Sequence, residues 1–181
     1  MNILIVIRAT TLVVGGILAT GCATLPPPDL NVESVYCYRS KVDRYKKGPC
    51  TSEPVPSLKA DAEAKQFRSD PTQLTVYVVR QSWGDGRNVI TVHADNGSAI
   101  ETLPDTLIRL RLRPGNHELS YVFDGRRVIT QVIGGAGEVR FVRLSGTAWA
   151  WASQYLWAEE PQAHTRQRAK STRLIADIDM T

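Results

Sequence analysis

The sequence predicts a mainly β domain, an antiparallel β-sandwich of seven to eight strands, with one short helix before it and a possible helix after it. From Leu74 onward, apolar and polar residues alternate with a period of two, as in strands buried on one face. The alternating segments are short, and turn sequences such as Asn96-Gly97 and Asp124-Gly125 separate them. Their number and spacing favour a sandwich, and an open barrel is the alternative architecture.

The first 21 residues predict a lipoprotein signal peptide. The apolar run 9–18 follows Arg8 and is too short to span a bilayer. The following segment, Ala19-Thr20-Gly21-Cys22, resembles the lipobox of bacterial lipoproteins, in which the cysteine is diacylated and becomes the first residue. The resemblance implies that lipidated Cys22 attaches the protein to a membrane. Ala23, where retained lipoproteins carry aspartate, implies the outer membrane, with the domain facing the periplasm.

The chain after the signal peptide has the length of one domain and a weak basic charge. The whole sequence holds 22 Lys and Arg against 18 Asp and Glu, which is less basic than nucleic-acid binding usually needs, and we expect no nucleic-acid partner. Residues 22–35 form the anchor and an extended tether, because the prolines at 26–28 favour polyproline II.

The segment 36–72 is predicted to hold a disulfide loop and the short helix. With Cys22 acylated, Cys37 and Cys50 remain as a pair that an oxidising periplasm would join; free thiols and metal ligands are the alternatives, although the spacing is not that of zinc motifs. The loop between them is basic and either solvated or attracted to anionic lipid headgroups. Its cations are Arg39, Lys41, Arg44, Lys46 and Lys47. The helix is expected over 56–67, capped by Ser57.

The β-sandwich domain is predicted to span 73–160, and its turns contain glycine, asparagine, aspartate or proline. The expected strands are 74–81, 88–94, 99–103, 106–112, 117–123, 127–133, 138–144 and 148–157. Residues 161–181 are expected to form a short exposed helix over 163–170 and a frayed end.

Three segments, 74–80, 112–119 and 135–143, resemble those of small bacterial lipoprotein β-sandwich domains of unknown function, similar to PEGA-like and transthyretin-like modules. The resemblance covers residues 73–160, and the Pro-Glu-Gly-Ala signature of the PEGA type is absent from this chain. It implies a β-sandwich and brings no catalytic residues.

The residues that most often carry chemistry are scattered. The three histidines lack the spacing of a metal motif; they are His93, His117 and His164. Asp95 is expected to form a hydrogen bond with His93, and His117 is expected to pack beside a Pro-Gly turn. Asp85 fits the chemistry of a turn. The sequence therefore predicts no catalytic residue, no metal site and no cofactor.

Two groups of residues form the candidate binding surface. Arg109, Arg111 and Arg113 alternate with apolar residues, and they form either a solvated sheet face or an anion-binding stripe. Four aromatic residues lie at odd positions, so an unbroken strand would place them on one face, either in the core or exposed for a glycan or a protein partner. They are Trp149, Trp151, Tyr155 and Trp157.

Together these features predict a non-catalytic binding or assembly module of the cell envelope, which holds an envelope protein partner. Recognition of glycan or anionic lipid is one alternative. A hydrolase of envelope glycan is another, and it would need a pair of carboxylates that the sequence does not display.

Overall fold

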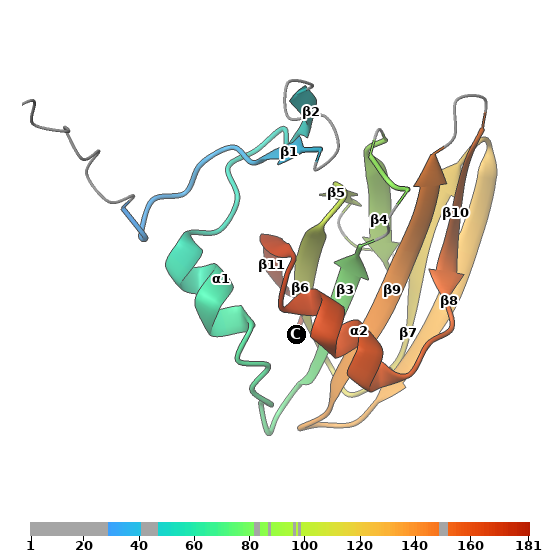
Figure 1. Ribbon diagram of the computed structural model, residues 1–181. Coiled ribbons are helices and arrows are strands. Elements are labelled where there is room, and N and C mark those ends of the chain that lie inside the picture. Colours follow the sequence, from blue (N-terminus) through green and yellow to red (C-terminus); the bar gives the residue numbers. More distant parts are fainter. Residues whose placement is uncertain are drawn as a thin grey trace, which may run out of the picture.

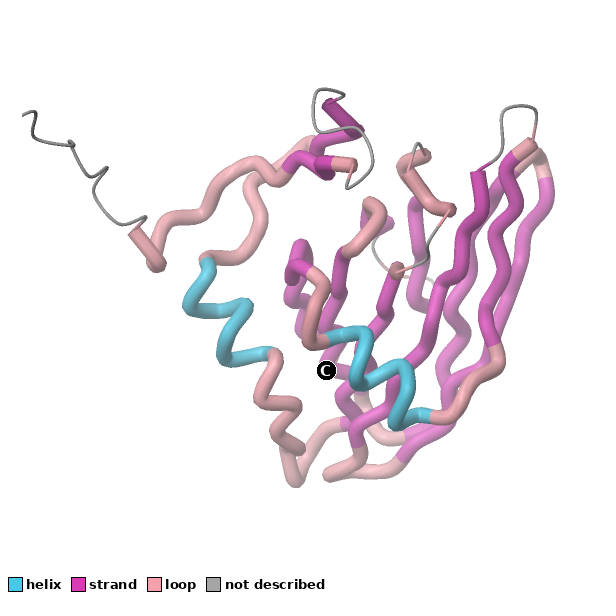
Figure 2. Tube along the Cα trace, in the orientation of Figure 1, coloured by secondary structure: helices cyan, strands magenta, loops and turns pink. Residues whose placement is uncertain are grey.

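The structure is a computed structural model, and it describes residues 29–40, 47–81, 84–86, 88–95, 97, 99–148 and 152–181. These residues form eleven strands and two helices (Figure 1, Figure 2), so the predicted mainly β class is confirmed. The predicted signal peptide, Cys22 and the predicted tether as far as residue 28 lie outside the described residues.

Nine of the strands form two sheets. The five-stranded sheet has the order β10 (Ser153–Ala158), β9 (Val139–Ala148), β3 (Leu74–Arg80), β6 (Thr106–Leu112), β11 (Arg173–Asp179). The four-stranded sheet has the order β5 (Ala99–Thr102), β4 (Ile90–Ala94), β7 (Gly115–Phe123), β8 (Arg126–Gly134).

The expectation of purely antiparallel pairing is wrong for the five-stranded sheet. β3 pairs in parallel with β9, and β6 pairs in parallel with β11. Strands joined by a short turn pair antiparallel, whereas parallel neighbours need a crossover connection. Here the chain passes through the four-stranded sheet between β3 and β9, and through α2 (Gln162–Ala169) before β11.

The expected strand 148–157 is confirmed over 153–157, but its first part is wrong. β9 continues to Ala148, and β10 begins at Ser153, which is paired with Ala148 in an antiparallel hairpin. The chain therefore reverses direction inside the expected strand. Trp149 and Trp151 lie outside the described residues.

The C-terminal segment is ordered, contrary to the expected frayed end. After α2, residues 173–179 form β11 at an edge of the five-stranded sheet. The sheet therefore extends beyond residue 160, where the predicted domain ended.

The two sheets share one core, and the helices cover a second one. Between the sheets, Val76 and Leu110 pack with Ala94 and Leu119 of the four-stranded sheet. On the opposite face of the five-stranded sheet, residues of β3, β6 and β9 pack with residues of the two helices and with Phe67. Figure 1 shows α2 crossing in front of β3 and β9, with β7 and β8 behind them. The order of layers is therefore helices, five-stranded sheet, four-stranded sheet.

The helix α1 (Leu58–Ala64) is capped at its N-terminus and bonded to β11 from its middle. The Ser57 hydroxyl accepts a hydrogen bond from the amide of Ala60, which is the usual N-cap contact, and Phe67 beyond the helix has a positive φ of 53°. Asp61 of α1 accepts a hydrogen bond from the amide of Leu174 at the start of β11. The helix thus closes part of an edge of the five-stranded sheet.

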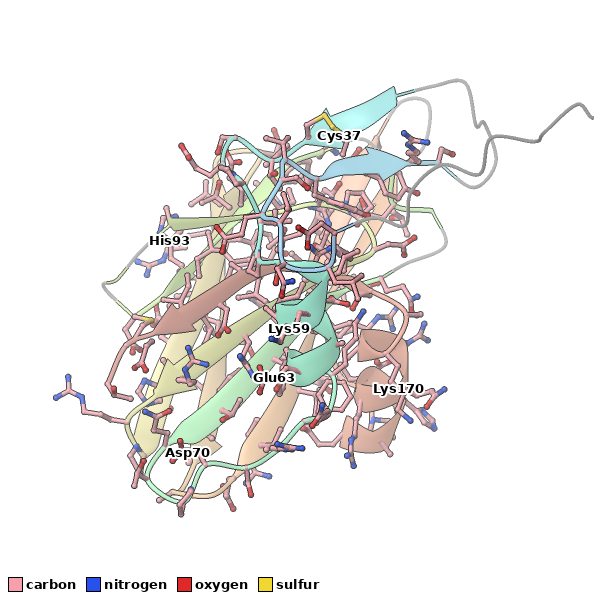
Figure 3. All side chains as sticks on the ribbon, turned by 90° about the vertical axis from the view of Figure 1, so that its left-hand side faces the viewer. Cys37, Lys59, Glu63, Asp70, His93 and Lys170 are labelled. Atoms are coloured by element: carbon pink, nitrogen blue, oxygen red, sulfur yellow. A yellow bond between two sulfur atoms is a disulfide. The ribbon has the colours of Figure 1, made fainter. Side chains whose placement is uncertain are left out.

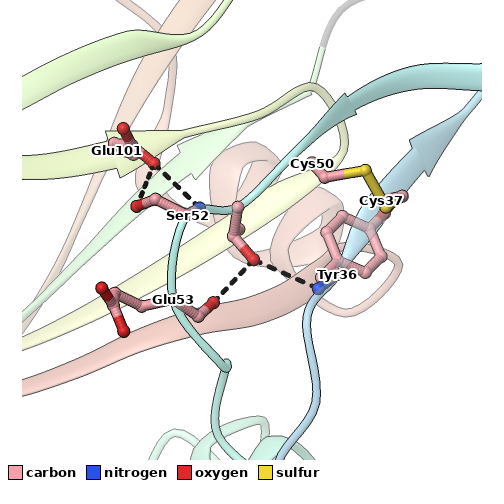
Figure 4. Close-up of a disulfide and its surroundings, with 7 residues drawn as sticks. Tyr36, Cys37, Cys50, Ser52, Glu53 and Glu101 are labelled. Carbon is pink, nitrogen blue, oxygen red and sulfur yellow. Dashed lines mark hydrogen bonds between the residues drawn. A yellow bond between two sulfur atoms is a disulfide. The ribbon is translucent and has the colours of Figure 1, made fainter.

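The predicted disulfide is confirmed. Cys37 and Cys50 are bonded, and they lie on the two strands of a small hairpin, β1 (Cys37–Arg39) and β2 (Lys47–Cys50). Figure 4 shows the hairpin joined to β5, because the amide and the hydroxyl of Ser52 both donate to the carboxylate of Glu101. Lys41, Arg44 and Lys46 of the basic loop lie outside the described residues.

Candidate functional site

The arginine stripe of β6 is largely paired within the protein. Arg109 is bound by Asp177 of β11 and by Glu63 of α1, and Arg111 contacts Asp177 and Asp179. These contacts raise the pKa of Arg109, chiefly through its hydrogen bonds to Asp177. Arg113 is exposed. Two of the three arginines therefore connect β6 to β11 and α1 and do not form a free anion-binding stripe.

The two described members of the aromatic group belong to the core. Tyr155 is buried between the sheets, where its ring packs against Phe123, and Trp157 is half-buried and packs against Tyr121. The indole nitrogen of Trp157 donates to the carbonyl of Val128 on β8. These contacts fit the core interpretation of Tyr155 and Trp157 and leave neither ring as an exposed platform.

Asp95 pairs with His117 and not with His93. Its carboxylate lies 2.7 Å from Nδ1 of His117, and Nε2 of the same ring lies 2.7 Å from the carbonyl of Arg113. Burial alone would raise the pKa of Asp95, but the bonds from His117 and the amide of Glu118 lower it. The ring thus connects the turn before β7 to the end of β4, which is a structural contact.

A buried ion pair that the sequence did not reveal lies at the end of β3. The guanidinium of Arg80 donates to both carboxylate oxygens of Asp85, at 2.7 and 2.8 Å, and also to the main-chain carbonyls of Thr102 and Asn88. Arg80 and Asp85 are almost fully buried. The acceptors around Arg80 satisfy its donors, so this cluster stabilises the junction of the two sheets.

Gly146 on β9 is required beside this cluster. A Cβ atom built at Gly146 would clash with the ring of Tyr155 and would lie 2.8 Å from the carboxylate of Asp85. The hydroxyl of Tyr155 is within 3.3 Å of Asp85, and burial, followed by the nearby Asp85, raises its pKa. No sequence motif indicates this arrangement, because Arg80 is the last residue of an alternating segment that resembles the other predicted strands.

The candidate binding site is a groove of about 770 Å³ between α2 and the first half of β9. We call it the α2–β9 groove. Its lining includes Phe67, Val139 and Phe141 on one side and Gln162, Arg166 and Lys170 on the other. Figure 3 shows Lys170, the residue directly after α2, at the side of the molecule and away from the disulfide hairpin.

The floor of the groove is aromatic. The ring of Phe67 meets the rings of Tyr77 and Phe141 edge to face, with centroids 5.0 and 5.1 Å apart, and Tyr77 and Phe141 are stacked. Phe67 is in this position because α1 ends just before it. The guanidinium of Arg166 lies 5.4 Å from the centroid of Phe67, within the range of a cation–π contact.

The groove carries positive charge. Among the described residues, Arg166 and Lys170 form no ion pair, and no acidic side chain lines the groove. The neighbouring Arg168, by contrast, is paired with Glu160, which also binds Arg143 of β9. The groove therefore combines an apolar floor with two uncompensated cations, a combination that suits a ligand with apolar groups and negative charge.

The described residues contain no cluster of three histidine, cysteine or acidic side chains able to hold a metal, and no helix long and apolar enough to cross a membrane. Comparison of the sequence with models of known protein families and with curated proteins finds no match. The interpretation of the groove therefore depends on its own geometry.

Proposed function

We propose that the protein is an outer-membrane lipoprotein, anchored through lipidated Cys22, whose periplasmic β-sandwich domain binds a partner without catalysis. Support for the anchor comes from the sequence 19–22 and from the polyproline tether that follows it. The disulfide between Cys37 and Cys50 is in keeping with an oxidising compartment.

The observation that carries the binding function is the α2–β9 groove. A ligand site usually combines a concave apolar surface with a few polar groups that fix orientation, and this groove has both. Half-buried Val139 and the exposed edges of the buried rings of Phe67 and Phe141 supply the apolar surface. Arg166 and Lys170 supply positive charge that no described residue neutralises. An acidic protein of the envelope is the partner that this site suits best.

The test is crosslinking in cells, followed by purification of the tagged protein from membranes. We expect the intact protein to capture a discrete partner, and the double variant Arg166→Glu, Lys170→Glu to lose it, because both side chains are exposed and their reversal changes charge without opening the core. A Cys22→Ala variant tests the anchor and is expected to leave the membrane fraction.

The matched control is the double variant Lys59→Glu, Arg126→Glu. Both of these residues are exposed, neither lines the groove, and the change in net charge is the same. Equal capture of the partner by the groove variant and by the control would refute binding at the groove. Membrane retention of Cys22→Ala would refute the lipid anchor.

A further inference from the structure

One edge of β9 is uncovered beside the groove. β9 begins at Val139, but β10 pairs with it only from Arg143 onward, where Ala158 is the last partner. Beyond Ala158 the chain leaves the sheet and enters α2. The first four residues of β9 therefore have a strand neighbour, β3, on one side only.

The register shows which main-chain groups face this open side. The amide of Thr75 on β3 donates to the carbonyl of Glu138, and Thr75 is the partner of Val139 in the parallel ladder. In a parallel ladder, alternate residues face the same neighbour, so Glu138 and Arg140 face β3. Val139 and Phe141 consequently direct their N–H and C=O groups away from β3, toward the edge that β10 leaves uncovered.

A side chain occupies one of these two positions. The carboxamide of Gln162 accepts from the amide of Phe141 at 2.7 Å and donates to its carbonyl at 2.9 Å. Gln162 thus continues the ladder of β10 by one residue, as the main chain of another strand would. No side chain of the described residues makes such a pair with Val139, which lines the groove.

We propose that an extended acidic segment of a partner protein adds to this edge of β9 as a further strand. Its main chain pairs with Val139, and its alternate side chains, which face α2, place carboxylates beside Arg166 and Lys170 over the aromatic floor. This inference rests on the proposed binding function and names the partner's chemistry and its mode of binding. An unpaired strand edge is a common site for peptide addition, in which main-chain hydrogen bonds give affinity and side chains give specificity.

A peptide fits this site better than a simple anion does. The edge of Val139 offers one donor and one acceptor, and a peptide main chain supplies the complement of both. A phosphate ion supplies acceptors for the two cations and at most an O–H for the carbonyl of Val139, but it lacks the fixed spacing of N–H and C=O that a peptide residue offers to a strand edge. The aromatic floor formed by Phe67 and Phe141 also favours a ligand with apolar surface.

The experiment uses the full-length protein in detergent micelles and a capped heptapeptide of alternating glutamate and valine. Binding is followed by the chemical shift of the Val139 amide in NMR spectra. Two further peptides carry N-methyl groups, either on all valines or on all glutamates. Since alternate N–H groups of a strand face opposite edges, strand addition requires one of these peptides to lose binding and the other to keep it.

We expect the unmodified peptide to shift the Val139 amide, and Arg166→Glu with Lys170→Glu to weaken binding about tenfold or more. The control Lys59→Glu with Arg126→Glu should retain the wild-type affinity. The proposal is overturned if both methylated peptides bind, if both fail, or if the unmodified peptide leaves Val139 unchanged. It is also overturned if inorganic phosphate displaces the peptide at equal concentration, because the site would then recognise a small anion.

This test is independent of the anchor and of the cell. Loss of the anchor or of any captured partner in cells, with peptide binding intact, would refute the proposed function alone. Capture of a partner in cells, without peptide binding at Val139, would refute strand addition alone.

Discussion

The two sheets of this protein differ in what covers their outer faces. The central strand β3 of the five-stranded sheet is buried at all seven positions, because the other sheet covers one face and the helices cover the other. In β8 of the four-stranded sheet, Ile129 and Ile133 remain exposed on the outer face.

This difference in cover determines how deeply the ion pairs of arginine are buried in each sheet. In the covered sheet Arg80 and Arg109 are held by carboxylates in well-formed pairs, because a buried charge without a partner is costly. On the open sheet, Arg127 and Glu118 form a pair that stays accessible to water and therefore contributes little. Ion pairs of similar length thus have different energetic consequences.

Among the tests of this contrast between the two sheets, Asp85→Ala has the largest expected effect. The change leaves Arg80 buried without its carboxylate, and we expect a loss of about 3–5 kcal/mol in the free energy of unfolding, measured with urea. The control is Glu118→Ala on the open sheet, with an expected loss of about 0–1 kcal/mol. Equal losses in the two variants would contradict the contrast.

A second test compares apolar residues. Leu107 is fully buried beneath the helices, so Leu107→Ala should cost about 2–5 kcal/mol through lost contacts and the cavity left behind. Ile133 is 67% exposed, and Ile133→Ala should change stability by less than about 0.5 kcal/mol. A large loss for Ile133→Ala, measured by the same urea titration, would mean that the outer face of the four-stranded sheet is covered in solution.

A third test concerns the helical cover itself. Ser57→Ala removes the N-cap of α1 and should lower the free energy of unfolding by about 1 kcal/mol. Hydrogen exchange at the amide of Leu174 should become faster, because this amide donates its hydrogen bond to Asp61 of the same helix. Ser69→Ala, at an exposed position outside the helix, is the matched control. Unchanged exchange at Leu174 would show that the cap does not hold the helix on the sheet edge.

The smallest effect is expected from pH at Glu160. Burial alone would raise its pKa, but the hydroxyl of Thr165 and the cations Arg143 and Arg168 outweigh burial and lower the pKa below its usual 4.5. Because the folded-state pKa is lowered, the carboxylate stabilises the fold above about pH 4.5, and this stabilisation is lost as the pH falls further.

Glu160→Gln should therefore destabilise the protein at pH 7, and the difference from wild type should shrink below pH 4.5. The measurement is urea unfolding across pH 3 to 7, with Glu159→Gln at the exposed neighbouring position as control. A difference that does not depend on pH would exclude this linkage.

Much of the fold can be predicted from the sequence because most strands are joined by short turns. The alternation over 106–112 and the turn at 124–125 locate β6 and the hairpin of β7 and β8. Alternation of apolar and polar residues does not show which strands lie side by side. The parallel pairing of β3 with β9 and of β6 with β11 could therefore not be predicted. β11 is not predicted, because nothing in the segment 173–179 alone shows that its aspartates pair with Arg109 and Arg111.

The candidate site was only partly visible in the sequence. The cations at 166, 168 and 170 were predicted to lie on an exposed helix, but the sequence could not tell that Glu160 neutralises Arg168 and leaves Arg166 free. The aromatic floor was hidden because Phe67 and Phe141 are distant in the chain and meet only when α1 and β9 pack. The uncovered edge of β9 depends on where β10 ends, and the sequence predicts the break between these two strands at 145–147, before its true position after Ala148.

β11 follows every other strand of the five-stranded sheet in the chain, so this sheet is completed late in synthesis. Until residues 173–179 are available, β6 has an open edge, and Arg109 lacks Asp177. A chain cut short before Arg173 would expose that edge to other chains, since unpaired strand edges promote aggregation. β11 therefore protects the edge of β6 only once it has been synthesised, after all the other strands of that sheet.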